Sequence, residues 1–194
     1  RHCSYSSSPK WPDDYMTPHI ADEIFSVLKS LGCHSVHIGG GEPLLKPDKI
    51  MDVLDAARRN NISIEYIETN ASWYTGEESA KAVLTELKSH GVHTLLISID
   101  PYHNEYIPFW KVKELIQACS KANVKVFPWQ VEFWSDLNAM DDRIPHSLDE
   151  YIRIFGQDYL LKLVNRYGLN LKGRALESFF FQAEDGIRDG TVTG

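Results

Sequence analysis

Apolar positions recur at helical spacing in several segments, with short apolar runs between them. The first helix is expected over residues 18–31, because Thr17 and Pro18 form a hydroxyl cap with proline at the first helical position and Gly32 ends the pattern. The same spacing predicts helices over 47–60 and 112–119, and a further helix that includes 80–87 and ends at Gly91. Strands are expected over 35–38, 62–67, 94–99 and 124–131.

The predicted strands begin about thirty residues apart, which is the length of a strand-loop-helix unit with parallel strands. The pattern therefore predicts an α/β fold with a parallel sheet. Beyond it, 134–145 is expected to be a long loop. The capping box from Ser147 to Glu150 predicts a helix reaching 166–168, and 169–171 is a candidate for one more strand.

Polar and glycine residues follow the predicted strands. The groups are Gly39-Gly40-Gly41-Glu42-Pro43, Glu68-Thr69-Asn70, Ser98-Ile99-Asp100 and Trp129-Gln130. Because ligands of parallel sheets lie at the carboxyl ends of the strands, these groups predict one site there. Glycine backbone, carboxylates, a hydroxyl and an amide together fit a small polar ligand that carries cationic and hydroxyl groups.

The composition of the chain limits the kinds of partner that it is expected to bind. The chain has 194 residues, 43% of them hydrophobic, and a net charge of -7, which is typical of one globular domain. No apolar run approaches the ~20 residues of a membrane span, and no dense basic run would attract nucleic acid. Three widely spaced cysteines, Cys3, Cys33 and Cys119, favour a reducing, cytoplasmic location over a disulfide framework.

The order of these motifs resembles the radical S-adenosylmethionine (radical SAM) superfamily. Arg1-His2-Cys3 stands about 37 residues before Gly40-Gly41-Glu42-Pro43, and Thr69-Asn70 and Ser98-x-Asp100 follow in order. Cys3 matches the last cysteine of the motif Cys-x-x-x-Cys-x-x-Cys, whose other two cysteines would lie ahead of Arg1. With one cysteine of three, the sequence as it stands is expected to be inactive.

The resemblance implies a partial (β/α)6 TIM-like barrel whose first strand is missing. It further implies a [4Fe-4S] cluster on three thiolates, with an open iron that binds S-adenosylmethionine. Reductive cleavage would yield a 5'-deoxyadenosyl radical that abstracts hydrogen from an unknown substrate, a small molecule or a peptide. A ferredoxin or flavodoxin is the implied electron donor.

The resemblance assigns metal binding to Cys3 and places His2 near the adenine. Backbone at Gly40 and Gly41 would approach the methionine ammonium, Glu42 would add negative charge, and Pro43 would fix the turn. The remaining contacts to the cofactor are assigned to Thr69, Asn70, Ser98 and Asp100, the last two through ribose hydroxyls. Where the family often has glycine after Thr-Asn, this chain has Ala71.

Other readings of the same residues stay open. Cys33-His34-x-x-His37 and His90-x-x-His93 have short spacings that zinc ligands also show. A (β/α) barrel or Rossmann-like protein could bind phosphate or a nucleotide at the glycine turn, although Glu42 would repel an anion. A barrel that binds without catalysis is a third possibility. Tyr102, His103, Trp129 and Gln130 are candidates for the substrate side.

The end of the chain predicts two further features. Gly173-Arg174-Ala175 is similar to a motif that precedes cysteine-rich C-terminal domains in some members, often peptide maturases. Residues 182–189 and 192–194 resemble a translated sequencing adapter. The expected organisation is therefore an incomplete radical SAM core over 1–178 and a non-native tail over 179–194.

Overall fold

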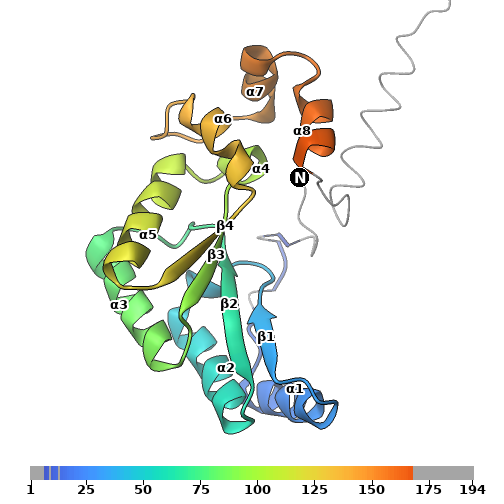
Figure 1. Ribbon diagram of the computed structural model, residues 1–194, viewed down its shortest axis with the longest axis vertical. Helices are drawn as coiled ribbons and strands as arrows, with labels where there is room; N and C mark the ends of the chain where they lie inside the picture. Colours follow the sequence, from blue (N-terminus) through green and yellow to red (C-terminus); the bar gives the residue numbers. More distant parts are fainter. Residues whose placement is uncertain (1–6, 9, 13, 168–194) are drawn as a thin grey trace, which may run out of the picture.

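Strands and helices alternate along the chain and build one parallel sheet (Figure 1). A computed structural model describes residues 7–8, 10–12 and 14–167. His2, Cys3, the predicted strand at 169–171, the Gly173-Arg174-Ala175 motif and the tail lie outside the described residues.

The sheet has four strands in the order β1-β2-β3-β4, every neighbouring pair parallel. Their bounds are β1 (Ser35–Ile38), β2 (Ser63–Thr69), β3 (Thr94–Ser98) and β4 (Lys125–Trp129). The connecting helices are α2 (Pro47–Arg59), α3 (Glu77–Ser89) and α5 (Phe109–Lys121), and the 3-10 helix η1 (Pro43–Leu45) follows β1. The predicted α/β class and parallel sheet are confirmed, and the sheet of the described residues is open.

The core lies between the sheet and these helices, which Figure 1 shows along one side of it. Ile67, Leu95 and Ile97 of the strands and Leu84 and Leu115 of the helices are fully buried. Each such side chain contributes about 1.5–3 kcal/mol by leaving water. Residues that alternate along a strand point to opposite faces, so this packing directs the intervening side chains to the other face of the sheet.

The first helix, α1 (Pro18–Ser30), begins as predicted, with the Thr17 hydroxyl accepting a hydrogen bond from the Ile20 amide at 3.3 Å. It packs on α2 through Ala21 and Phe25, which are buried. The apolar positions at helical spacing, by contrast, lie largely on the exposed side; these are Ile20, Ile24, Val27 and Leu31. Periodicity therefore gave the helix but not the face that it buries.

Short helices gather at the carboxyl end of the sheet, at the top of Figure 1. They are α4 (Pro101–Asn104), the 3-10 helix η2 (Val131–Phe133), α6 (Trp134–Asn138), α7 (Leu148–Phe155) and α8 (Tyr159–Tyr167). The loop expected at 134–145 thus contains a helix. The single helix expected after Ser147 is two helices, because Gly156 adopts φ +107° and ends α7. No helix in the described part of the chain is long and apolar enough to cross a membrane.

Candidate functional site

The glycine turn after β1 forms one wall of the site. Gly40 and Gly41 have φ of +88° and +56°, and a Cβ at either position would meet no atom of the described residues within 4 Å. Positive φ is strained for other residues, which explains glycine at both positions. The space beside them means that a ligand can approach this backbone. Gly39 differs, since a Cβ there would lie 2.6 Å from Glu68 Oε2.

Glu42 ties this turn to the end of β2. Its Oε1 accepts hydrogen bonds from the Leu44 amide (3.2 Å) and the Thr69 hydroxyl (2.9 Å), and its Oε2 accepts from the Asn70 amide (2.7 Å). The residue is only 8% exposed. The hydrogen bonds of its carboxylate are therefore made largely within the protein, and they connect the glycine turn to the loop after β2.

Burial also changes the acidity of this group. Desolvation raises the pKa of Glu42 from 4.5 to about 7, although the hydrogen bonds from Asn70, Thr69 and Leu44 lower it. A positive charge on His103 is the smallest of the influences that lower this pKa. A cationic ligand group placed beside Glu42 would act in the same direction and favour the carboxylate.

Thr69 and Asn70 are brought to the site as predicted, but mainly as its framework. The Thr69 hydroxyl donates to Glu42 and accepts from the Ala71 amide (3.1 Å) and Trp73 Nε1 (2.9 Å), and the residue is 2% exposed. The Asn70 side-chain oxygen accepts from the Ser72 amide at 2.9 Å. Ala71 has φ +66°, a conformation that glycine adopts without strain. Their contacts to a cofactor stay predictions.

Asp100 lies directly after β3 and caps α4. Its Oδ1 accepts from the His103 amide at 2.9 Å, and its Oδ2 is 2.6 Å from His103 Nδ1. The Asp100 side chain is 4% exposed and that of His103 29%. An aspartate one residue before a proline is a helix start, so the sequence did contain a signal for α4.

Ser98 and Trp129 are register partners at the ends of β3 and β4. Trp129 belongs to a row of rings across the sheet. His37 stacks on Tyr66 at 4.9 Å, Tyr66 meets Phe127 at 6.4 Å, and Phe127 meets Trp129 at 6.1 Å. Phe127 and Trp129 are about half exposed, at 47% and 48%, so this row offers apolar ring surface beside Ser98.

The N-terminal segment contacts the glycine turn, which no sequence pattern indicated. The Gly41 amide donates to Ser7 Oγ at 3.2 Å, and the Tyr15 hydroxyl donates to the Glu42 carbonyl at 3.4 Å. These contacts span 34 and 27 residues, so they depend on the folded chain and not on local spacing. They bring Ser7 and Tyr15 to the turn.

Among the described residues, no three histidine, cysteine or acidic side chains converge as a metal site. Cys33 Sγ lies 3.1 Å from the Ser35 carbonyl, and Cys119 is fully buried in the core. The zinc reading therefore gains no support from this part of the chain. Cys3, the predicted cluster ligand, is outside it.

The family model of the radical SAM superfamily matches residues 1–132, about two thirds of the chain. The chain belongs to the radical SAM superfamily. Members of this superfamily generally use S-adenosylmethionine and an iron–sulfur cluster. The open glycine turn, the buried Glu42 and the partly exposed His103 fit a ligand with an ammonium group and hydroxyls. The described residues alone do not provide the thiolates that a cluster needs.

Other comparisons add little to the radical SAM assignment. No curated protein matches the chain. A solved structure described as a mandelate racemase from Bordetella bronchiseptica RB50, complexed with 2-oxoglutarate/phosphate, is similar over 68% of this chain at 15% identity and a TM-score of 0.34. This chain covers 42% of that one.

Proposed function

We propose that this chain is the part of a radical SAM enzyme that binds S-adenosylmethionine beside a [4Fe-4S] cluster, with Cys3 as one of three thiolate ligands. Bound together and reduced, the two cofactors supply a 5'-deoxyadenosyl radical that abstracts hydrogen from a substrate. A small molecule or peptide as substrate, a ferredoxin or flavodoxin as electron donor and a cytoplasmic location belong to the same proposal.

The observation that carries the proposal is the contact of the N-terminal segment with the glycine turn. Ser7 accepts the Gly41 amide, and Cys3 precedes Ser7 by four residues. Four residues of chain span at most about 14 Å, a short separation that supports a cluster ligand near the turn. The proposal therefore combines this ligand and the backbone that would receive the methionine ammonium in one site.

The residues of the chain have distinct tasks in this site. Gly40 and Gly41 leave their backbone open for the ammonium group. Glu42 holds the turn against the end of β2 and places negative charge behind it. The short helices lie at the carboxyl end of the sheet (Figure 1), where they would limit the access of water to a bound ligand.

The cluster assignment is tested with a variant that carries Cys-x-x-x-Cys directly ahead of Arg1, so that Cys3 completes the motif. Anaerobic reconstitution should give about four iron and four sulfide ions per chain. The matched control is the same extended chain with Cys3→Ser, which should lose most of the bound iron. Equal iron content in both proteins would contradict the role of Cys3.

A Cys33→Ser change in the extended chain is a second control. Cys33 is half-buried beside Ser35, away from the proposed ligand set, so its loss should leave the iron content unchanged. Loss of iron in this variant, with retention in Cys3→Ser, would move the cluster to another place in the fold and would reject the proposed site.

A further inference from the structure

The short helix α4 exposes one side chain at the carboxyl end of the sheet. Pro101, Tyr102 and Asn104 are buried, whereas the His103 side chain is 29% exposed. Asp100, which caps the helix, is nearly inaccessible at 4%. Between these two polar side chains, His103 is therefore the one better placed to meet a ligand.

Asp100 fixes the imidazole ring of His103. Its carboxylate is a hydrogen-bond acceptor, so His103 Nδ1, at 2.6 Å from Oδ2, carries the proton in the neutral ring. Nε2 then has the lone pair and acts as an acceptor. The other carboxylate oxygen holds the His103 backbone amide at 2.9 Å. Ring position and tautomer are thus set by one buried carboxylate.

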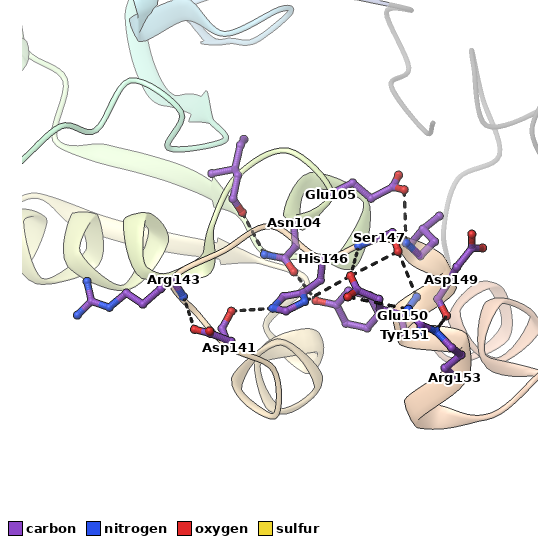
Figure 2. Close-up of polar contacts among 12 residues, drawn as sticks. Asn104, Glu105, Asp141, Arg143, His146, Ser147, Asp149, Glu150, Tyr151 and Arg153 are labelled. Carbon is purple, nitrogen blue, oxygen red and sulfur yellow. Dashed lines mark hydrogen bonds and ion pairs between the residues drawn. The ribbon is translucent and has the colours of Figure 1, made fainter.

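Figure 2 shows a polar network around Asn104, the last residue of α4. The Asn104 side chain accepts from the Tyr151 hydroxyl at 2.6 Å and donates to the Ile107 carbonyl at 3.1 Å. The Asn104 carbonyl accepts from the His146 amide at 3.1 Å. A four-residue helix has little stability of its own, so the contacts of Asn104 with Tyr151 of α7 and with His146 ahead of it help to hold α4 in place.

We propose that His103 contacts the ligand, accepting a hydrogen bond from a hydroxyl group of a nucleoside-type ligand, and that Asp100 is its positioning residue. This inference rests on the proposed function and changes one part of it, because the sequence assigned the hydroxyl contact to Asp100 itself. The topology supports the placement, because α4 follows β3 and the glycine turn follows β1, so that both lie at the carboxyl end of one parallel sheet.

The first test needs no ligand. In the full chain, long-range ¹H–¹⁵N spectra of His103 should show a proton on Nδ1 and none on Nε2. Asp100→Ala should give a mixture of tautomers, and Asp100→Asn, whose amide oxygen can still accept, should restore the Nδ1 form. A mixture in the unsubstituted chain, or no change in Asp100→Ala, would overturn the positioning role.

The second test measures binding of S-adenosylhomocysteine and of its 2',3'-dideoxy analogue to the chain extended with Cys-x-x-x-Cys and reconstituted with iron and sulfide. One hydrogen bond between neutral groups corresponds to a preference of about fivefold for the ligand with hydroxyls. His103→Ala should abolish this preference and Asp100→Ala should reduce it. His93→Ala is the matched control, because His93 is exposed just before β3, at the opposite end of that strand, and it should retain the preference.

The outcomes separate the two proposals. If His103→Ala binds S-adenosylhomocysteine, has an unchanged backbone amide spectrum away from α4 and keeps the hydroxyl preference, the role of His103 is wrong and the proposed function stands. If the reconstituted extended chain, with no further substitution, binds neither nucleoside, the proposed function fails, and the inference that depends on it fails as well.

Discussion

The titration of Glu42 gives the most quantitative prediction. Its pKa is raised from 4.5 to about 7, chiefly by burial, and this difference corresponds to about 3 kcal/mol of unfolding free energy. Because the pKa is higher in the folded state, the folded state binds the proton more tightly. The contribution of Glu42 to stability is therefore fully present below pH 4.5 and is lost as the pH rises through 7.

The change to test is Glu42→Gln, which removes the titrating group. Urea unfolding followed by tryptophan fluorescence gives the free energy of unfolding of each protein across this pH range. The stability of the unsubstituted chain minus that of Glu42→Gln should fall by about 3 kcal/mol between the acidic and alkaline ends. The Gln side chain also places an amide group near the Asn70 amide, which changes the unfolding free energy of the variant. This change is the same at every pH, so it does not affect the predicted fall.

Glu86→Gln is the matched control, since Glu86 lies exposed on α3. The difference in unfolding free energy between this variant and the unsubstituted chain should stay constant over the same pH range. A direct measurement accompanies these comparisons: the side-chain carboxyl ¹³C shift of Glu42 should titrate with a midpoint near 7. A constant difference for Glu42→Gln, or a midpoint near 4.5, would refute the reasoning from burial.

The other predictions concern the turn and the buried polar groups. Gly40→Ala should lower the unfolding free energy by about 1–2 kcal/mol, because a side chain at φ +88° is strained, as chemical denaturation would show. Gly39→Ala should cost less, since the Glu68 side chain that it meets can move; a larger loss than in Gly40→Ala would contradict this ranking. Tyr159→Phe should cost about 1–3 kcal/mol in thermal or urea unfolding, because Asp136, 9% exposed, loses a hydrogen bond of 2.9 Å; an unchanged stability would show that water replaces the hydroxyl.

The sheet and its main helices could be predicted because their signals are local. Apolar periodicity and the caps at Thr17 and Ser147 depend on neighbours within one or two turns, and both caps form. The break between α7 and α8 was missed because one glycine, Gly156, outweighed an apolar spacing that continues through it. Helix α4 was missed because Asp100-Pro101 is compatible with either a turn or a helix start.

The site was predicted by location and less well by role. The carboxyl ends of parallel strands lie at the same edge of a sheet irrespective of the side chains that follow them. The prediction that Glu42, Thr69 and Asp100 lie at one edge is therefore confirmed. Their hydrogen bonds could not be read from spacing, because Glu42 meets Thr69 across 27 residues. The structure shows these groups buried and bonded within the protein, and their contacts to a ligand stay predictions. Cys3 stays a prediction.

The central claim is that this radical SAM chain binds S-adenosylmethionine at the glycine turn next to a cluster held by Cys3. The most direct test is the amount of 5'-deoxyadenosine that the chain extended with Cys-x-x-x-Cys forms from S-adenosylmethionine after anaerobic reconstitution and reduction. We predict product in the extended chain and a near-complete loss in its Cys3→Ser counterpart. A reconstituted, reduced protein with bound cluster and no 5'-deoxyadenosine would contradict the claim.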